Sequence, residues 1–220
     1  MSAILKLSHV YYHYSDAKDN DYVLKDINFE FEKGKIYAIK GRSGSGKTTL
    51  LSLISGLEQC SDGIILYEGK NLKTKNLDEY RSKEIGIVFQ SYNLLPHLTA
   101  SENIILSMDI NHLKEKNKKQ KAIELLNQVG LSSDYADRKI LRLSGGEQQR
   151  VAIARSLSYH PNMIIADEPT GNLDRETEDE ILTILKDLAH KEQKCVIIVT
   201  HSKNVCDNVD VVYELKKQKV

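Results

Sequence analysis

Short apolar segments alternate with longer amphipathic patterns along most of the chain. Four of these segments are continuously apolar and β-prone, as in strands covered on both faces of a sheet; they lie at 36–39, 85–89, 163–166 and 196–199. Helical spacing of apolar residues appears between and after them, at 122–129, 151–157 and 175–191. Strands that alternate with helices form parallel sheets with right-handed crossovers, so the pattern predicts an α/β fold with a mainly parallel sheet.

Two stretches depart from this alternation. Near the N-terminus, residues 3–11 are strand-like, and 27–31 alternate apolar with polar side chains at a period of two, with a polar turn expected at 15–21. This hairpin-like start predicts a small antiparallel sheet. From 91 to about 159 the pattern is helical, which predicts a separate helical region inserted between the strands.

The glycine-rich loop that follows the strand at 36–39 carries the clearest chemistry. It reads Gly41-Arg42-Ser43-Gly44-Ser45-Gly46-Lys47-Thr48, which fits the G-x-x-x-x-G-K-[ST] pattern of a phosphate-binding P-loop. Glycines let the backbone wrap around phosphate oxygens, and the helix expected from Thr49 onward adds positive potential at its N-terminus. Lys47 would reach the β- and γ-phosphates and Thr48 would bind Mg²⁺. A chance match is the alternative, and the strand–loop–helix context disfavours it.

The length of 220 residues allows one large domain or two small ones, and we expect a single domain over residues 1–220. The nucleotide-binding P-loop NTPase core would comprise about 1–90 and 160–220, including the N-terminal antiparallel β subdomain. The inserted α-helical subdomain would comprise about 91–159.

Polar residues also follow the other apolar strands directly. Gln90, Asp167, Glu168 and His201 each come at or just beyond a strand's carboxyl end, where parallel sheets place their functional side chains. Asp167 would hold Mg²⁺, and Glu168 would act as base or orient water beside the γ-phosphate. A helix N-cap is the alternative use of this acidic pair, and Pro169 argues against it.

Gln90 and His201 each have a functional and a structural interpretation. Gln90 would bind Mg²⁺ or the attacking water, and His201 would contact the γ-phosphate and hold Glu168. A lone Gln or His after a strand is more often structural, but the P-loop context favours function here.

A second glycine-rich loop, Ser144-Gly145-Gly146, precedes the helical pattern at 151–157. It is either a second anion site or a tight turn with a serine cap. One chain would then have two anion-binding loops but only one nucleotide. A two-fold dimer explains this, because each nucleotide would lie between the P-loop of one chain and the Ser144 loop of the other.

These motifs in this order resemble ATP-binding-cassette (ABC) ATPases over essentially the whole chain. The resemblance rests on the P-loop, Gln90, the signature Leu143-Ser144-Gly145-Gly146-Glu147-Gln148, the 164–168 segment, Asn172-Leu173-Asp174 and His201. The segments at 89–99 and 168–174 are similar to the ATPases of lipoprotein release, macrolide efflux and antimicrobial-peptide export. The arginine- and lysine-containing stretch at 138–142 departs from the family in lacking a proline.

The resemblance implies further roles. Tyr14 would stack on adenine, although Tyr11 and Tyr12 are close enough to compete for this role. Glu147 would belong to the signature that meets the opposite subunit's ATP, and Asp174 to the D-loop contact across the homodimer. An integral-membrane permease would dock on Gln90 to Leu98, where Leu94, Leu95 and Leu98 are suited equally to an interface or to a core.

The remaining helical stretch carries less specific signals. Either Thr99 or Ser101 is a suitable cap for its first helix, and Gly130 is a plausible stop after the stripe at 122–129. Five lysines within 114–121 are expected to form a solvated face, with a phosphate or lipid contact as the alternative.

Composition narrows the function and location. Lys plus Arg and Asp plus Glu each number 31, so the net charge is zero and nothing indicates a nucleic-acid partner. Three scattered cysteines, with neither a signal peptide nor a membrane-spanning run, suit a reducing cytosol. We therefore expect a peripheral protein at the cytoplasmic face of the cell membrane.

The sequence thus predicts a transport ATPase with ATP and Mg²⁺ as cofactors. An ATP-switched regulatory module of a membrane complex is the alternative. A DNA-repair or chromosome ATPase is disfavoured because only 95 residues separate Thr48 from Ser144 (144 − 48 − 1), too few for a long coiled-coil insertion. A GTPase is disfavoured because the Asn-Lys-x-Asp motif is missing.

Overall fold

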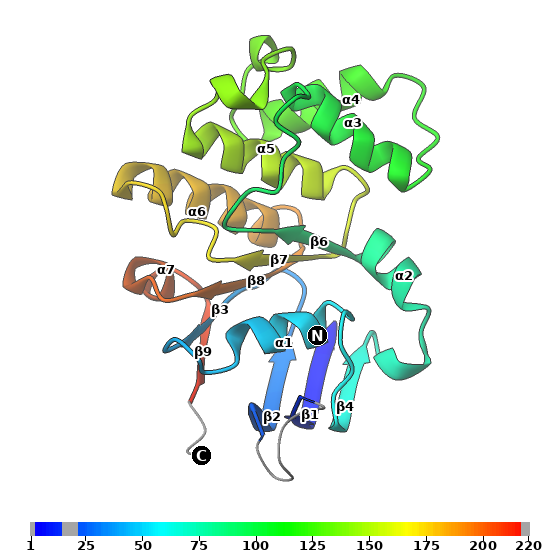
Figure 1. Ribbon diagram of the computed structural model, residues 1–220, viewed down its shortest axis with the longest axis vertical. Helices are drawn as coiled ribbons and strands as arrows, with labels where there is room; N and C mark the ends of the chain where they lie inside the picture. The colour runs from blue at the N-terminus through cyan, green and yellow to red at the C-terminus, as the bar shows by residue number, and fades with distance from the viewer. Residues whose placement is uncertain (1–2, 15–21, 217–220) are drawn as a thin grey trace.

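The computed structural model describes residues 3–14 and 22–216, and a five-stranded parallel sheet lies at its centre (Figure 1). The strand order is β6–β7–β8–β3–β9. In chain order these strands are β3 (Ile36–Gly41), β6 (Ile85–Val88), β7 (Met163–Asp167), β8 (Cys195–Thr200) and β9 (Val211–Leu215). Ile164 pairs with Val196, which also pairs with Ile36, so the predicted apolar runs lie side by side.

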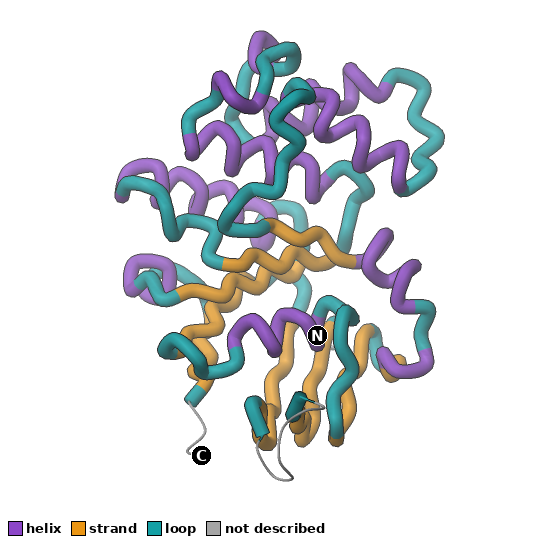
Figure 2. Tube along the Cα trace, viewed as in Figure 1, coloured by secondary structure: helices purple, strands orange, loops and turns teal. Residues whose placement is uncertain are grey.

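Alternate residues of these strands face two different cores. Ile164 and Ile198 pack with the helices α3 to α6, whereas Ile165 and Ile197 pack with α1 and the antiparallel sheet. The helices of these layers are α1 (Lys47–Ile54), α3 (Ala100–Ile110), α4 (Lys118–Gln128), α5 (Gly145–Leu157) and α6 (Arg175–His190). Burial on both faces explains why the strands are apolar without alternation. In Figure 2 the parallel strands lie between the upper group of helices and α1.

A second, antiparallel sheet has the strand order β2–β1–β4–β5. Its strands are β1 (Leu5–Tyr12), β2 (Leu24–Phe31), β4 (Asp62–Tyr67) and β5 (Lys70–Asn71). The predicted α/β class with an N-terminal antiparallel sheet is therefore confirmed. β5 gives no signal in the sequence because it consists of two polar residues. The turn expected at 15–21 lies outside the described residues.

The helical region begins at a capping box. Thr99 Oγ1 accepts from the Glu102 amide at 3.2 Å, and a Glu102 carboxylate oxygen accepts from the Thr99 amide at 2.7 Å. Thr99 is thus the cap, whereas the Ser101 hydroxyl is buried and donates to the Ala136 carbonyl. Gly130 adopts a φ of 80° just after α4, as expected for a helix stop.

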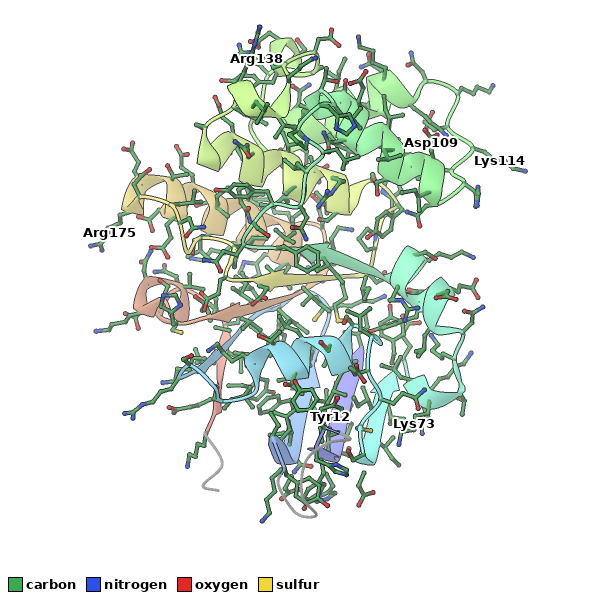
Figure 3. The ribbon with its side chains drawn as sticks, in the orientation of Figure 1. Tyr12, Lys73, Asp109, Lys114, Arg138 and Arg175 are labelled. Atoms are coloured by element: carbon green, nitrogen blue, oxygen red, sulfur yellow. The ribbon has the colours of Figure 1, made fainter. Side chains whose placement is uncertain are left out.

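The lysine run at 114–121, which extends from the α3–α4 connection into the first turn of α4, has the properties of a solvated face. Lys114 points away from the protein (Figure 3), and Lys118 and Lys119 form ion pairs with Asp109 and Asp137. No phosphate or lipid contact is therefore needed to explain these charges.

Short helical segments complete the chain. They are α2 (Leu77–Glu79), which continues as a π-helical turn over Tyr80–Glu84, α7 (Lys203–Asp207), and 3₁₀ turns at Leu72–Thr74, Ser133–Tyr135 and Ile140–Arg142. Within residues 3–14 and 22–216, no helix has the length and apolarity required to cross a bilayer.

Candidate nucleotide site

The P-loop joins β3 to α1 at the carboxyl edge of the parallel sheet. Gly44 and Gly46 have φ values of 74° and 89°, which L-residues with a side chain rarely adopt. A Cβ atom on Gly46 would also lie 2.8 Å from Leu24 Cδ2. The glycines are therefore required by the loop's own geometry, which leads directly into the N-terminus of α1.

The polar atoms of Lys47 and Ser45 differ in their hydrogen bonding within this loop. Lys47 Nζ donates to the carbonyls of Gly41 and Arg42 at 2.8 and 3.3 Å. The Ser45 hydroxyl is buried and has no hydrogen-bond partner among the described residues. A buried hydroxyl without a partner is costly, and a phosphate oxygen is a suitable acceptor for it. Arg42, Ser43 and Thr48 are exposed at the loop surface.

Asp167 lies at the end of β7 in the neighbourhood of Lys47. Burial, and then repulsion from Glu168, raise the pKa of Asp167, while the Lys47 charge lowers it and is outweighed. A bound cation would lower this pKa again, because an opposite charge favours the ionised carboxylate. A carboxylate destabilised in this way fits a cation site.

Glu168 and His201 form a hydrogen-bonded pair at the same edge. His201 Nδ1 lies 2.7 Å from Glu168 Oε1, while Glu168 Oε2 accepts from the Thr200 hydroxyl at 3.1 Å and the His201 amide at 3.3 Å. Glu168 itself has a φ of 44°, and its amide donates to the Val199 carbonyl at 2.9 Å. The carboxylate is therefore fixed from β8, which lies next to β7 in the sheet.

Gln90 is exposed beyond β6 and lies against the loop that follows Glu168. Its amide nitrogen is 3.4 Å from Asn172 Oδ1, and a Cβ atom on Gly171 would lie 2.8 Å from it. Gln90 thus stands at the same sheet edge as Asp167 and Glu168.

The oxygen donors at this edge fit Mg²⁺. The set comprises the Thr48 hydroxyl, the Gln90 amide oxygen and the Asp167 carboxylate, which are the ligand types that hard cations prefer. Across the described ranges, no group of three or more His, Cys, Asp or Glu side chains forms a metal site. Mg²⁺ commonly uses few protein ligands and completes its shell with water and phosphate oxygens, so the two observations agree.

Tyr14 is the tyrosine beside the P-loop helix. Its hydroxyl lies 3.0 Å from Thr49 Oγ1, and its side chain is 48% exposed. Tyr12 is buried and packs edge-on against Tyr14, while Tyr11 packs against Tyr22. Of the three tyrosines considered for adenine, Tyr14 is therefore an exposed one whose hydroxyl contacts the P-loop helix.

The Ser144 loop begins α5 with a second capping box. Ser144 Oγ accepts from the Glu147 amide at 3.3 Å, and Glu147 accepts from the Ser144 amide at 2.7 Å and from the Tyr135 hydroxyl at 2.7 Å. Burial raises the pKa of Glu147, but these hydrogen bonds outweigh it and lower the pKa overall. The serine cap considered from the sequence is present, and Ser144 remains exposed.

The two glycines of this loop have different neighbours. A Cβ atom on Gly145 would lie 3.0 Å from the Tyr92 hydroxyl, and one on Gly146 would lie 2.4 Å from Thr177 Cγ2 in α6. Asp174, exposed before α6, caps that helix by accepting from the Thr177 amide at 3.0 Å and its hydroxyl at 2.8 Å. The signature helix thus packs directly on the helix that Asp174 begins.

Several residues of this site were missed in the sequence analysis. Thr200 supports the Glu168 carboxylate, Asn172 contacts Gln90, and Thr177 contacts Gly146 and Asp174. The position of Thr200 at the carboxyl end of β8, directly before His201, was the one available signal. The contacts of Thr177 depend on helix packing and have no local signature.

The permease segment expected at 90–98 has mixed exposure. Leu95 is 39% exposed, whereas Leu94 is partly buried and packs against the helical core. The core alternative therefore holds for Leu94.

Comparisons with known proteins agree with this geometry. The family model described as ABC transporter matches residues 24–171. The chain is 45% identical over 215 residues to a Bacillus subtilis protein named as the uncharacterized ABC transporter ATP-binding protein YclH, covering 98% of this chain and 94% of that protein. It is 39% identical over 216 residues to LolD of Francisella tularensis, the lipoprotein-releasing system ATP-binding protein, covering 96% and 93%.

Solved structures of ABC transporter cassettes are also similar to this chain. The dimeric structure of MJ0796, a bacterial ABC transporter cassette, superimposes with a TM-score of 0.84 at 36% identity, covering 96% of this chain and 94% of that one. A dimeric post-hydrolysis state of MJ0796 bound to ADP and Pi gives a TM-score of 0.85 at 34% identity, covering 98% and 97%. The chain therefore belongs to the ABC transporter family and is its ATP-binding ATPase subunit.

Proposed function

We propose that this ATPase forms a head-to-tail homodimer around two ATP molecules and drives a separate membrane permease. The observation that carries the dimer is the placement of the two glycine loops. The P-loop helix α1 packs on one face of the parallel sheet, while α5 packs with α6 against the other. In Figure 1, α5 lies beyond α6 and away from α1. Ser144 is therefore poorly placed to contact a nucleotide on its own chain's P-loop, and well placed to contact one on a second chain.

Within each nucleotide site of the proposed dimer, different side chains bind different parts of ATP. Lys47 and the P-loop amides hold the phosphates, the ring of Tyr14 stacks on adenine, and the signature residues 144–147 of the second chain close the site. Thr48, Gln90 and Asp167 would hold Mg²⁺, which neutralises developing phosphate charge when bound.

Glu168 is the proposed catalytic base or water-orienting group. Its carboxylate already has a fixed orientation through Thr200 and His201, which are within 3.3 Å. A base that is oriented before the reaction loses little entropy in reaching the attacking water. His201 positions Glu168 and would contact the γ-phosphate from the same side.

We further propose a peripheral location on the cytoplasmic face of the membrane. The permease would dock on the 90–98 segment, where Leu95 supplies exposed apolar surface. The name of LolD, a relative from a lipoprotein-releasing system, favours an export or mechanotransmission system acting on a lipid-like, peptide or drug-like molecule.

Replacing Glu168 with Gln tests the proposal. We expect ATP binding to persist, turnover to fall by about a hundredfold or more, and an ATP-dependent dimer to accumulate in size-exclusion chromatography with light scattering. Lys47→Ala is the matched P-loop control and should weaken ATP binding and abolish the dimer. Normal turnover in Glu168→Gln would contradict the base assignment, and a monomer at saturating ATP would contradict the dimer.

The partner is tested by pull-down from membranes. A permease that co-purifies with the wild type, and whose transported molecule stimulates turnover, supports transport. A membrane partner with ATP-dependent association but without stimulation by any solute would instead support a regulatory module.

A further inference from the structure

The segment after Gln90 begins with a strained turn. Tyr92 and Asn93 have φ values of 60° and 50°, so two consecutive residues with side chains adopt the left-handed conformation. Local bonds hold part of this turn, since the Tyr92 amide donates to Phe89 O at 3.1 Å and the Ser91 hydroxyl donates to Asn93 Oδ1 at 2.8 Å. Strain of this kind persists when surrounding structure fixes it, and it is found preferentially at functional and switch regions.

Arg155 supplies the contact from outside the turn. Its guanidinium donates to the Tyr92 carbonyl at 2.9 Å and also to the Asn93 carbonyl. These bonds are charge-assisted because the donor is a guanidinium, and the burial that lowers the pKa of Arg155 shows that the group is partly desolvated. Both bonds go to main-chain oxygens, and they therefore fix the path of the turn and are independent of its side chains.

The same turn also touches the beginning of α5. The Tyr92 hydroxyl stands where a Cβ atom on Gly145 would come within 3.0 Å of it. Arg155 is ten residues further along the helix, a rise of about 15 Å. The turn thus contacts the signature helix both at its first turn and near its end, and it would follow a movement of the whole helix.

We propose that Arg155 is a positioning residue that clamps the turn at Tyr92 and Asn93 to the signature helix. A displacement of the 90–98 segment would then move Ser144, and closure around ATP at Ser144 would shift the 90–98 segment. Release of the Arg155 bonds would free the strained turn, so the two sites would be coupled through the formation and release of these bonds. The direction of signalling rests on the proposed function, because it assumes that the permease docks on 90–98.

Amide hydrogen exchange followed by mass spectrometry tests the clamp on the intact chain without nucleotide. Arg155→Met removes both bonds and keeps much of the apolar length, and exchange over 91–95 should accelerate about tenfold or more. Arg150→Met is the matched control, because Arg150 lies on the same helix and donates to the Val129 carbonyl at 2.6 Å and to Glu180 at 2.7 Å. It should leave exchange over 91–95 unchanged.

A second comparison tests the linkage. In a Glu168→Gln background, ATP should slow exchange over both 91–95 and 144–149, and adding Arg155→Met should abolish the effect over 91–95 while retaining it over 144–149. Arg155→Lys preserves a charge and one donor group, so it should restore part of the effect. This conservative variant also replaces Arg155→Met if the latter does not fold.

Different outcomes would contradict the clamp, the linkage to ATP and the proposed function. Wild-type exchange over 91–95 in Arg155→Met, or an equal acceleration in Arg150→Met, would overturn the clamp. ATP-dependent protection of 91–95 that survives Arg155→Met would overturn the linkage. If Glu168→Gln fails to dimerise with ATP, the proposed function fails, but the comparison without nucleotide still decides whether Arg155 holds the turn.

Discussion

The contact between Gly146 and Thr177 makes a quantitative prediction about the signature helix. A Cβ atom on Gly146 would lie 2.4 Å from Thr177 Cγ2, which is far inside van der Waals distance. Thr177 cannot easily rotate away, because its hydroxyl donates to Asp174 at 2.8 Å and β-branched side chains in helices have few rotamers. In Gly146→Ala, α5 and α6 must therefore separate.

The size of the effect follows from two opposing terms. Overpacking of this kind costs about 1–3 kcal/mol. Replacing Gly by Ala in a helix raises the free energy of unfolding by up to about 1 kcal/mol, and by less in the first turn. We therefore expect Gly146→Ala to lower the free energy of unfolding by about 1–2 kcal/mol, measured by urea denaturation with far-UV circular dichroism.

A second substitution identifies the responsible atom. Thr177→Ser removes Cγ2 but keeps the hydroxyl that bonds to Asp174, and the other Thr177 atoms near the new Cβ lie at 3.7 and 3.8 Å, which is ordinary contact. Gly146→Ala should therefore be nearly neutral in the Thr177→Ser background, giving a coupling energy of about 1–2 kcal/mol. The reasoning is refuted if Gly146→Ala is as stable as the wild type, or if Thr177→Ser does not relieve it.

Two further predictions concern charge and nucleotide recognition. The pKa of Asp167 is raised by burial and by Glu168, so the folded state binds this proton more tightly than the unfolded state, and the stability this gives is lost as pH rises above the ordinary Asp range. Asp167→Asn should thus raise the free energy of unfolding, measured by urea titration without Mg²⁺, at about pH 7 and by a smaller amount at about pH 4. The same variant should lose Mg²⁺-dependent turnover. A lower free energy of unfolding at neutral pH would contradict this prediction. Tyr14→Ala should weaken ATP binding about tenfold in calorimetry, whereas Tyr14→Phe, which keeps the ring, should stay within about twofold. Equal losses in both variants would instead assign the role to the hydroxyl contact with Thr49.

Much of the fold could be predicted because its signals are local. Strands buried on both faces must be apolar throughout, which made β7 and β8 visible, and parallel pairing then brings the residues after them to one edge. Glu168 and His201 are therefore expected at one edge from the sequence alone, and their side chains are 2.7 Å apart in the structure.

The contacts that could not be predicted join residues distant in the chain. Gly146 had a reason to be glycine in an anion loop, but its contact with Thr177 depends on how α5 crosses α6. Arg155 resembles any polar residue on an amphipathic helix until the turn at Tyr92 is placed beside it. β5 has too little apolar surface to be recognised, and it forms because β4 offers a pairing edge.

The first turn of α6 joins the parts of the site that belong to different nucleotides in the proposed dimer. Thr177, whose hydroxyl donates to Asp174, packs against the signature at Gly146. The next residue is Glu178, and one of its carboxylate oxygens accepts from the Thr170 hydroxyl at 3.1 Å and from the Ser202 hydroxyl at 2.7 Å. Thr170 and Ser202 stand just beyond Glu168 and His201, so the same short stretch of helix holds the loops that carry the hydrolytic pair. In the proposed dimer, the signature that would meet the partner's ATP and the proposed base that would serve the chain's own ATP therefore share one helix, which would couple the two sites physically.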